Sequence, residues 1–393
     1  MKIPFNKAFI AGRELFHIAE AVSNGELKGG GPFTVNCQRW IEDRFGIGKV
    51  LLTSSGTGAL EMAAHLAGIE PGDEVILPSY TFTSTANAFV LRGACPVFVD
   101  IREDTLNIDE KLIPAAVTSR TKAICPVHYA GVSCEMNRIT EIAAGHQLTV
   151  VEDAAHGIMA AYNDKSLGSI APLGVFSFHE TKNYSSGEGG ALLINDPSYY
   201  ERAEIIWEKG TNRAKFFRGE VDKYTWVDIG SSYLPSEIIA AFLYGQLERA
   251  DEINSRRLAI WQHYYDSFAP LQASGLLRLP VIPPGCRHNA HMFYIVLESP
   301  AVREQVVGWM RDLGVSVVSH YVPLHLSPMG RSFGGREGQL PVTERLADSI
   351  LRLPLYCDLT EEQQSIVISG LARFFLGQQN SQRLKVLPRA ANE

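Results

Sequence analysis

Short apolar runs that alternate with helical patterns constrain the fold of this chain more than any other feature. From Lys49 onward, each run is followed by a turn and by a segment with helical periodicity. Buried strands that alternate with helices indicate a large, mostly parallel sheet with helices on both faces. The sequence therefore predicts an α/β fold. The runs cover residues 50–53, 74–77, 96–99, 122–125 and 148–151.

Polar or aromatic side chains stand where several of these strands are predicted to end. A small polar turn at 54–57 follows the first run, and Phe82 follows the second. Asp153 comes two residues after the fifth run, and Lys182 comes just past a further apolar run over 175–178. In open parallel sheets the ligand lies outside the carboxyl ends of the strands. We therefore expect these residues to form one composite site.

Lys182 stands in a polar loop between two apolar runs, 175–178 and 191–194. A charged lysine without a partner between buried strands would be costly. A lysine that loses its proton is instead a nucleophile that forms a Schiff base with a carbonyl. Taken alone, Lys182 also fits an ordinary surface lysine in a loop. Its place among the other strand-end residues favours the reactive interpretation.

The residues predicted to surround Lys182 each have a functional and a structural interpretation. The turn Ser54-Ser-Gly-Thr-Gly58 opens a helix, whose first N–H groups bind phosphate, but it also fits a plain helix cap. Asp153 would pair with a protonated pyridine nitrogen or cap the next helix. Phe82 would stack on a flat ring or pack in the core, and His156 would face the ligand or simply pack. As a set, these residues match the needs of pyridoxal 5′-phosphate (PLP).

The second half of the chain has a different pattern. A long helical stretch begins near Ser236, and we expect it to bridge two domains with a kink. The pattern then becomes α+β, with strands over 291–297 and 315–319 and helices over 301–313, 343–351 and 361–375. The predicted parts are an N-terminal arm over 1–13, a large domain over 14–250, a smaller C-terminal domain over 251–378 and a loose polar tail over 379–393.

Composition argues against several classes of protein. The chain has 393 residues, of which 46% are hydrophobic and 20% charged, as in ordinary globular proteins. Its net charge of −7 and the lack of a long basic run argue against a dedicated nucleic-acid surface. No segment approaches the ~20 uninterrupted apolar residues of a membrane helix. Six scattered cysteines without a C-x-x-C pair predict a reduced cytoplasmic protein without a zinc site.

Seven stretches of the sequence together resemble the DegT/DnrJ/EryC1/StrS family of sugar-nucleotide aminotransferases, which have PLP fold type I. The resemblance covers nearly the whole chain. The stretches are Ser54-Ser-Gly-Thr-Gly-Ala-Leu60, Pro71-Gly-Asp-Glu-Val-Ile76, Pro78-Ser-Tyr-Thr-Phe-Thr-Ser-Thr-Ala-Asn87, Pro126-Val-His-Tyr-Ala-Gly131, Val151-Glu-Asp-Ala-Ala-His156, Phe176-Ser-Phe-His-Glu-Thr-Lys182 and Leu353-Pro-Leu-Tyr356.

The resemblance implies roles for the matching positions. Lys182 would hold PLP covalently and move the proton between the substrate carbon and the cofactor. Asp153 would pair with the pyridine nitrogen, and Phe82 would stack on the ring. His156 would lie on the O3′ side of the ring. The residues implied to bind the phosphate are Ser55, Gly56, Thr57 and Ser177.

The resemblance also implies a homodimer whose subunits share their active sites. The loop around Ser232 and the N-terminal arm are the segments expected to complete the partner's site. The sequence departs from the family at these contacts. Much of the family has Gln in place of His156, and many members have Asn and Arg where this chain has Ser232 and Leu234. The contacts that the family makes at these positions therefore do not carry over directly.

Five further stretches resemble the family members that aminate a dTDP-4-keto sugar. They are His179-Glu-Thr-Lys-Asn-Tyr184, Glu208-Lys-Gly-Thr-Asn-Arg213, Phe216-Phe-Arg-Gly219, Val221-Asp-Lys-Tyr-Thr-Trp226 and Asp228-Ile-Gly-Ser-Ser-Tyr-Leu234. This resemblance implies L-glutamate as the amino donor and dTDP-4-keto-6-deoxy-D-glucose as the acceptor. The candidate sugar contacts are His320, Tyr321 and His325, which follow a predicted strand, and Tyr184, which is close to Lys182 in the sequence. The histidines also fit a packed loop.

The sequence leaves three other functions to compare with this one. The enzyme could aminate another keto sugar nucleotide, at carbon 3 or with gluco stereochemistry at carbon 4. It could be a dehydratase, but the dehydratases of this family carry His at the position of Lys182. It could be a sugar-nucleotide sensor without activity, but Lys182, Asp153 and Phe82 are all present.

Overall fold

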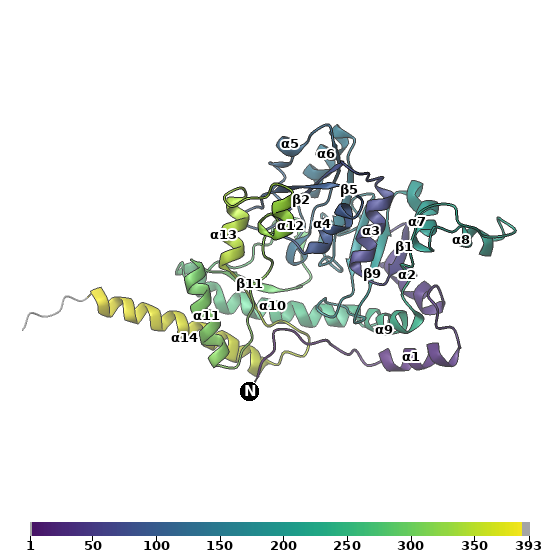
Figure 1. Ribbon diagram of the computed structural model, residues 1–393. Coiled ribbons are helices and arrows are strands. Elements are labelled where there is room, and N and C mark those ends of the chain that lie inside the picture. The colour runs from purple at the N-terminus through teal and green to yellow at the C-terminus, as the bar shows by residue number, and fades with distance from the viewer. Residues whose placement is uncertain (1, 387–393) are drawn as a thin grey trace, which may run out of the picture.

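A seven-stranded sheet lies at the centre of the larger part of the molecule (Figure 1). The computed structural model describes the backbone of residues 2–386 and the side chains of residues 2–377. The strand order is β1-β9-β8-β5-β4-β2-β3, and only β9 runs antiparallel to its neighbours. The predicted α/β fold with a mostly parallel sheet is confirmed. The strands are β1 Lys49–Thr53, β2 Glu74–Pro78, β3 Cys95–Val99, β4 Thr121–Ile124, β5 Thr149–Asp153, β8 Leu173–Ser177 and β9 Gly190–Ile194.

Helices cover both faces of this sheet because successive residues of a strand point to opposite sides. Val50 and Leu52 of β1 pack in one core with α2, α6 and α9, whereas Leu51 packs in a second core with α3, α4 and α7. The helices of this part are α1 Glu14–Ser23, α2 Pro32–Phe45, α3 Gly56–Leu66, α4 Thr83–Val90, α5 Ile113–Ala116, α6 Met136–His146, α7 Tyr200–Trp207, α8 Arg213–Phe217 and α9 Glu237–Leu247.

The smaller part of the molecule is built on a two-stranded antiparallel sheet of β11 (Phe293–Val296) and β12 (Ile350–Leu353). A separate core packs these strands against α10 (Ala250–Ala273), α11 (Pro300–Asp312) and α14 (Glu361–Val386). In the described part of the chain, no helix combines the length and apolar character that a membrane span requires. The remaining elements are β6 Ala161–Tyr162, β7 Lys165–Ser166, β10 Cys286–Arg287, α12 Pro328–Ser332, α13 Pro341–Ser349 and the short 3₁₀ turns Tyr129–Gly131, Pro197–Tyr199 and Leu324–Leu326.

The helix predicted over 343–351 is too long. α13 ends at Ser349, and the next four residues form β12. Leu351 and Leu353 lie in the core of the smaller part while Arg352 between them does not, which is the alternation of a strand. The prediction of a helix was therefore wrong for residues 350 and 351, which belong to a strand.

Three other expectations also changed. The strand predicted over 315–319 makes only isolated bridges, at Val315 and Val318. The long helix predicted from Ser236 is divided into two helices, α9 and α10, where a single kinked helix was expected. α14 continues through Val386, into the predicted loose tail, and projects away from the rest of the molecule (Figure 1). The last residues of that tail, 387–393, lie outside the described residues.

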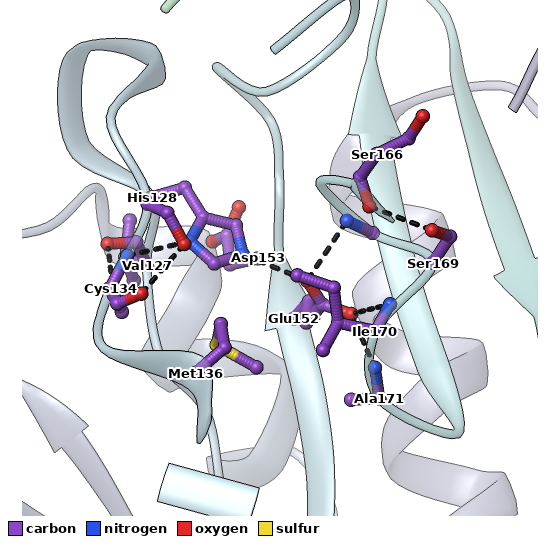
Figure 2. Close-up of polar contacts among 12 residues, drawn as sticks. Val127, His128, Cys134, Met136, Glu152, Asp153, Ser166, Ser169, Ile170 and Ala171 are labelled. Atoms are coloured by element: carbon purple, nitrogen blue, oxygen red, sulfur yellow. Dashed lines mark hydrogen bonds and ion pairs between the residues drawn. The ribbon is translucent and has the colours of Figure 1, made fainter. Parts of the chain in front are cut away.

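A buried carboxylate, Glu152 on β5, ties two loops to the sheet (Figure 2). Its Oε1 accepts the N–H groups of Ile170 and Ala171 at 2.7 and 2.6 Å. Its Oε2 accepts the N–H of Gly168 and the ring N–H of His128, both at 2.9 Å. Four donors therefore surround a carboxylate that is fully buried. These donors compensate for the loss of hydration that makes a buried charge costly.

His128 fixes the segment after β4 to the same carboxylate. Its Nδ1 accepts the N–H of Cys134 at 3.2 Å, so the neutral ring carries its proton on Nε2, toward Glu152. The N–H of His128 donates to the carbonyl of Asp153 at 3.1 Å. Because neighbouring residues of a strand point to opposite faces, Glu152 holds the loops on one face and Asp153 points to the other.

Replacing Glu152 with Gln should lower the free energy of unfolding by about 3–5 kcal/mol, because the amide turns an N–H group toward two existing donors. Denaturant unfolding followed by circular dichroism measures this change. The matched control is Glu141→Gln, since Glu141 on α6 is 69% exposed. The control should change stability by less than about 0.5 kcal/mol. Equal effects of the two substitutions would contradict the role given to Glu152.

Candidate active site

A cavity of about 340 Å³ opens at the carboxyl ends of the parallel strands, where the large sheet meets the smaller part of the molecule. Lys182 lines this cavity. The structure also brings most of the other predicted site residues to its wall. They are Ser55, Gly56, Thr57, Phe82, Asp153, His156, Ser177, His320 and Tyr321.

Helix α3 begins at the edge of the cavity and can hold a phosphate. The Ser55 hydroxyl accepts the N–H of Gly58 at 3.0 Å and so caps the helix. The N–H groups of Gly56 and Thr57, in the first turn, have no partner within the helix. Strand β9 comes so close that a Cβ at Gly190 would lie 2.5 Å from the nitrogen of Gly56. Both interpretations of the turn therefore apply, since it is capped and still presents N–H donors to an anion.

Asp153 is a buried carboxylate without a cationic partner. It is 4% exposed. Its Oδ2 accepts the hydroxyl of Thr85 at 2.7 Å, and its Oδ1 accepts the N–H of Ala155 at 3.1 Å. None of the ion pairs among the described residues includes Asp153. A protonated pyridine nitrogen would supply the missing positive charge, so the residue fits the PLP ring.

Lys182 is half-buried in a loop that extends the β8–β9 hairpin. Its N–H donates to the carbonyl of His179 at 2.9 Å. Burial lowers the pKa of Lys182 to about 8, with a further lowering by Arg352 and an opposing effect of Asp153. The amine is therefore more readily deprotonated than that of an ordinary lysine, as a nucleophile that attacks a carbonyl must be.

Three histidines form one wall of the cavity, beside the lysine. The rings of His156 and His291 stack with their centroids 4.0 Å apart. His320 stacks on Tyr321 at 3.6 Å. Burial lowers the pKa of all three histidines well below the usual value, and the charge of the nearby lysine lowers it further. The wall is therefore neutral and flat, and it presents ring nitrogens rather than positive charge.

Two predicted sugar contacts do not reach the cavity, and these predictions were wrong. Tyr184 is fully buried, and its hydroxyl donates to the carbonyl of Ala250 at 3.0 Å. His325 is also fully buried, with Nδ1 2.7 Å from the Ser79 hydroxyl and Nε2 3.0 Å from a carboxylate oxygen of Glu344. Internal hydrogen bonds satisfy both side chains, so neither is available to the sugar.

The two segments expected to serve a partner subunit differ in position. Ser232 is exposed and does not line the cavity of its own chain, so its role in a partner's site stays a prediction. The N-terminal arm reaches the cavity of its own chain, where Phe5 forms part of the wall.

Several cavity residues were missed in the sequence. Arg352 is not among the predicted site residues because the predicted helix over 343–351 ends next to it, although the order Leu351-Arg-Leu353 before a proline is a strand signal. Thr85 lies three residues after Phe82 on α4, one helical turn away, which is a usable signal. The pattern around His291 carried no signal that distinguished it from a packed residue.

Comparison with known proteins decides the family. The model of the DegT/DnrJ/EryC1/StrS aminotransferase family matches residues 10–372. The chain belongs to this family. It is similar to the spore coat polysaccharide biosynthesis protein SpsC of Bacillus subtilis (strain 168), with 33% identity over 94% of this chain and 96% of SpsC. The predicted membership of the family is confirmed.

Solved structures agree with this assignment. DesV of S. venezuelae, in complex with a ketimine intermediate, is 31% identical, with a TM-score of 0.86 over 95% of this chain and 98% of DesV. A Streptococcus pneumoniae protein assigned as a sugar aminotransferase superposes with a TM-score of 0.87 in its PLP form, at 25% identity over 94% of this chain and 97% of that protein. The cofactor of this PLP fold type I aminotransferase is therefore PLP, as the sequence predicted.

The lowered pKa of Lys182 predicts a pH-dependent change in stability. Below pH 8 the amine is charged in both states, and burial destabilises only the folded one. Lys182→Met should therefore stabilise the cofactor-free protein fully below about pH 8. The gain should shrink as the pH rises from about 8 to 10.5, the ordinary lysine value. Denaturant unfolding at several pH values measures it, with the exposed Lys165→Met as control. A gain that does not change over this range would contradict the assignment.

Proposed function

We propose that this aminotransferase transfers the amino group of L-glutamate to carbon 4 of dTDP-4-keto-6-deoxy-D-glucose. The products would be 2-oxoglutarate and dTDP-4-amino-4,6-dideoxy-D-galactose. The observation that carries the reaction type is the placement of the Lys182 amine in one cavity with the unpaired carboxylate of Asp153 and the first turn of α3. The choice of sugar depends on sequence stretches that resemble the dTDP-4-amino-4,6-dideoxygalactose transaminases of enterobacterial common antigen synthesis. They are the five stretches within residues 179–184, 208–213, 216–219, 221–226 and 228–234.

The proposal gives a chemical role to three residues that line the cavity, Asp153, Lys182 and Phe82. PLP, when bound, supplies the electron sink. Asp153, oriented by the Thr85 hydroxyl, holds the pyridine nitrogen in its protonated form. Lys182 moves the proton at the substrate carbon, and its pKa of about 8 suits both removal and return of that proton. Phe82, whose side chain is 58% exposed, offers a face to the ring.

The phosphate and the sugar would occupy opposite ends of the cavity. Gly56, Thr57 and Ser177 line the phosphate end. A Cβ at Gly56 would lie 2.9 Å from that of Ser177, which shows how closely the start of α3 approaches the end of β8. At the other end, Tyr321 and His320 are the proposed sugar contacts.

We also propose that the enzyme is a homodimer. The loop around Ser232 carries three large apolar side chains that are exposed in the single chain, namely Trp226 at 77%, Val227 at 50% and Ile229 at 39%. Exposed apolar clusters of this kind mark protein contacts. A second subunit would cover them and bring the loop to the partner's cavity.

The proposed setting is the cytoplasm, with a product that enters common antigen or a related surface polysaccharide. The described residues include six free cysteines, which suits a reducing compartment. The similar protein SpsC is named for polysaccharide biosynthesis. The alternative within the family is another keto sugar nucleotide, giving a 3-amino or gluco 4-amino product. A sensor without activity is less compatible with an intact set of Lys182, Asp153 and Phe82.

Incubation of the PLP-loaded protein with L-glutamate and dTDP-4-keto-6-deoxy-D-glucose should yield a dTDP sugar with an axial amine at carbon 4. Nuclear magnetic resonance of the purified product determines the carbon and the configuration. An equatorial amine at carbon 4, or an amine at carbon 3, would contradict the proposed product. Absence of any aminated sugar with this substrate would require another acceptor.

Lys182→Ala should abolish transamination, with a loss of more than about 10³-fold, because no other described amine lines the cavity. Borohydride reduction followed by mass spectrometry should find PLP attached to the wild-type peptide that contains Lys182 and to no peptide of the variant. Lys165→Ala, at an exposed position, is the matched control and should keep both properties. An active Lys182→Ala variant would rule out the role of this lysine.

A further inference from the structure

The cavity contains a second unpaired charge, the guanidinium of Arg352. This residue lines the same cavity as Lys182. Its Nε is buried and has no hydrogen-bond partner. Among the described residues, no carboxylate forms an ion pair with it, although Asp153 and Glu188 also line the cavity. A guanidinium remains charged at all relevant pH values and has five N–H donors to satisfy.

The orientation of β12 in the smaller part directs the side chain of Arg352 toward the cavity. The strand neighbours Leu351 and Leu353 point into the core of the smaller part. Ile350 and Tyr294, the residue paired with Arg352 across the sheet, pack instead with the aromatic cluster next to the cavity. Arg352 must lie on that second face, since residues two apart on a strand share a face.

Backbone hydrogen bonds hold Arg352 rigidly in this position. Its N–H donates to the carbonyl of Val318 at 2.8 Å and its carbonyl accepts the N–H of Val318 at 3.2 Å. The guanidinium lies over the ring of Phe5 with 4.6 Å between its carbon and the ring centroid. The arm that carries Phe5 is fixed by a bridge between Ile3 and Val315. Cation–π stacking orients the planar group but leaves its N–H edge without an acceptor.

The charge of Arg352 acts on the reactive end of the cavity. It lowers the pKa of Lys182, after the larger effect of burial. It also lowers the pKa of His320, again after the larger effect of burial. No carboxylate of the protein pairs with the Arg352 guanidinium, which lies close to the amine of Lys182. Such an unpaired charge destabilises the fold unless a ligand supplies the anion.

We propose that Arg352 binds the α-carboxylate of the amino donor through paired N–H···O hydrogen bonds and so selects an α-amino acid as the donor. This inference depends on the proposed aminotransferase function. The planar guanidinium matches a carboxylate in geometry and charge. In an α-amino acid the carboxylate is one bond from the carbon that carries the reacting amine, so its partner must lie near Lys182. Arg352 meets this condition.

The other anions of the reaction fit Arg352 less well. The proposed binding site for the cofactor phosphate is the first turn of α3, with Gly56 and Thr57, at the large sheet. The diphosphate of a 4-keto sugar nucleotide is attached at carbon 1, across the sugar ring from the reacting carbon. It must therefore lie farther from Lys182 than a group one bond from the reacting carbon.

Arg352→Gln and Arg352→Lys in the PLP-loaded protein test the proposal, with Arg138→Gln on the exposed surface of α6 as the matched control. Loss of a charge-assisted bidentate pair should raise the L-glutamate concentration for half-maximal rate in the donor half-reaction about 10- to 100-fold in the Gln variant. The Lys variant keeps the positive charge but loses the two parallel N–H donors of the guanidinium. Its half-maximal L-glutamate concentration should lie between those of the wild type and the Gln variant. Calorimetric binding of 2-oxoglutarate should weaken in parallel, which gives a readout independent of turnover.

Binding of thymidine diphosphate, and the half-reaction of the aminated enzyme with the keto sugar, should change less than about threefold. Loss of thymidine diphosphate binding with unchanged glutamate use would overturn the proposal, because Arg352 would then bind the nucleotide sugar. Unchanged behaviour of both variants would overturn it as well. A wild type that accepts no amine from any α-amino acid would instead refute the proposed function and this inference with it. Circular dichroism and thermal unfolding check that the variants are folded.

Discussion

The geometry of the site depends on the buried carboxylate of Glu152. Its four donors come from His128 and from three backbone N–H groups of the loop before β8. Removing any of these groups would leave a charge in a low-dielectric interior, so the two loops and β5 must form together. β5 and β8 in turn carry Asp153 and Ser177 to the cavity. A carboxylate buried on one face of the sheet thus fixes the strand that presents Asp153 to the cavity on the other face.

The cavity contains two charges of opposite sign that the protein does not pair with each other. Asp153 lies at the carboxyl end of the large sheet, and Arg352 comes from the smaller part of the molecule. Both charges act on the pKa of Lys182, which Asp153 raises and Arg352 lowers. Unsatisfied charges of this kind are avoided in cores and are characteristic of functional sites, where ligands complete them. In the proposed reaction the cofactor ring would pair with one charge and the amino donor with the other.

The sequence predicted the large sheet and its strand-end residues well, because parallel strands buried on both faces leave strong apolar runs and because ligands bind at their carboxyl ends. The smaller part was predicted less well. Its short strand β12 follows a helix without a break, and Arg352 was lost with it. The predicted sugar contacts of Tyr184 and His325 depend only on position in the sequence. Side-chain direction and internal partners, which depend on tertiary contacts, exclude both residues from the cavity.

The order of the two acids on β5 has a consequence for how this chain can change. Glu152 and Asp153 point to opposite sides, so a shift of the strand by one residue would exchange their places. The shorter acid would then face the loop, and the longer one would enter the cavity. An insertion or deletion within β5 would thus damage structure and chemistry at once, whereas added residues in the loops before and after this strand would leave both carboxylates in place. The number of residues in β5 is therefore fixed, whereas the lengths of the adjoining loops are free to vary.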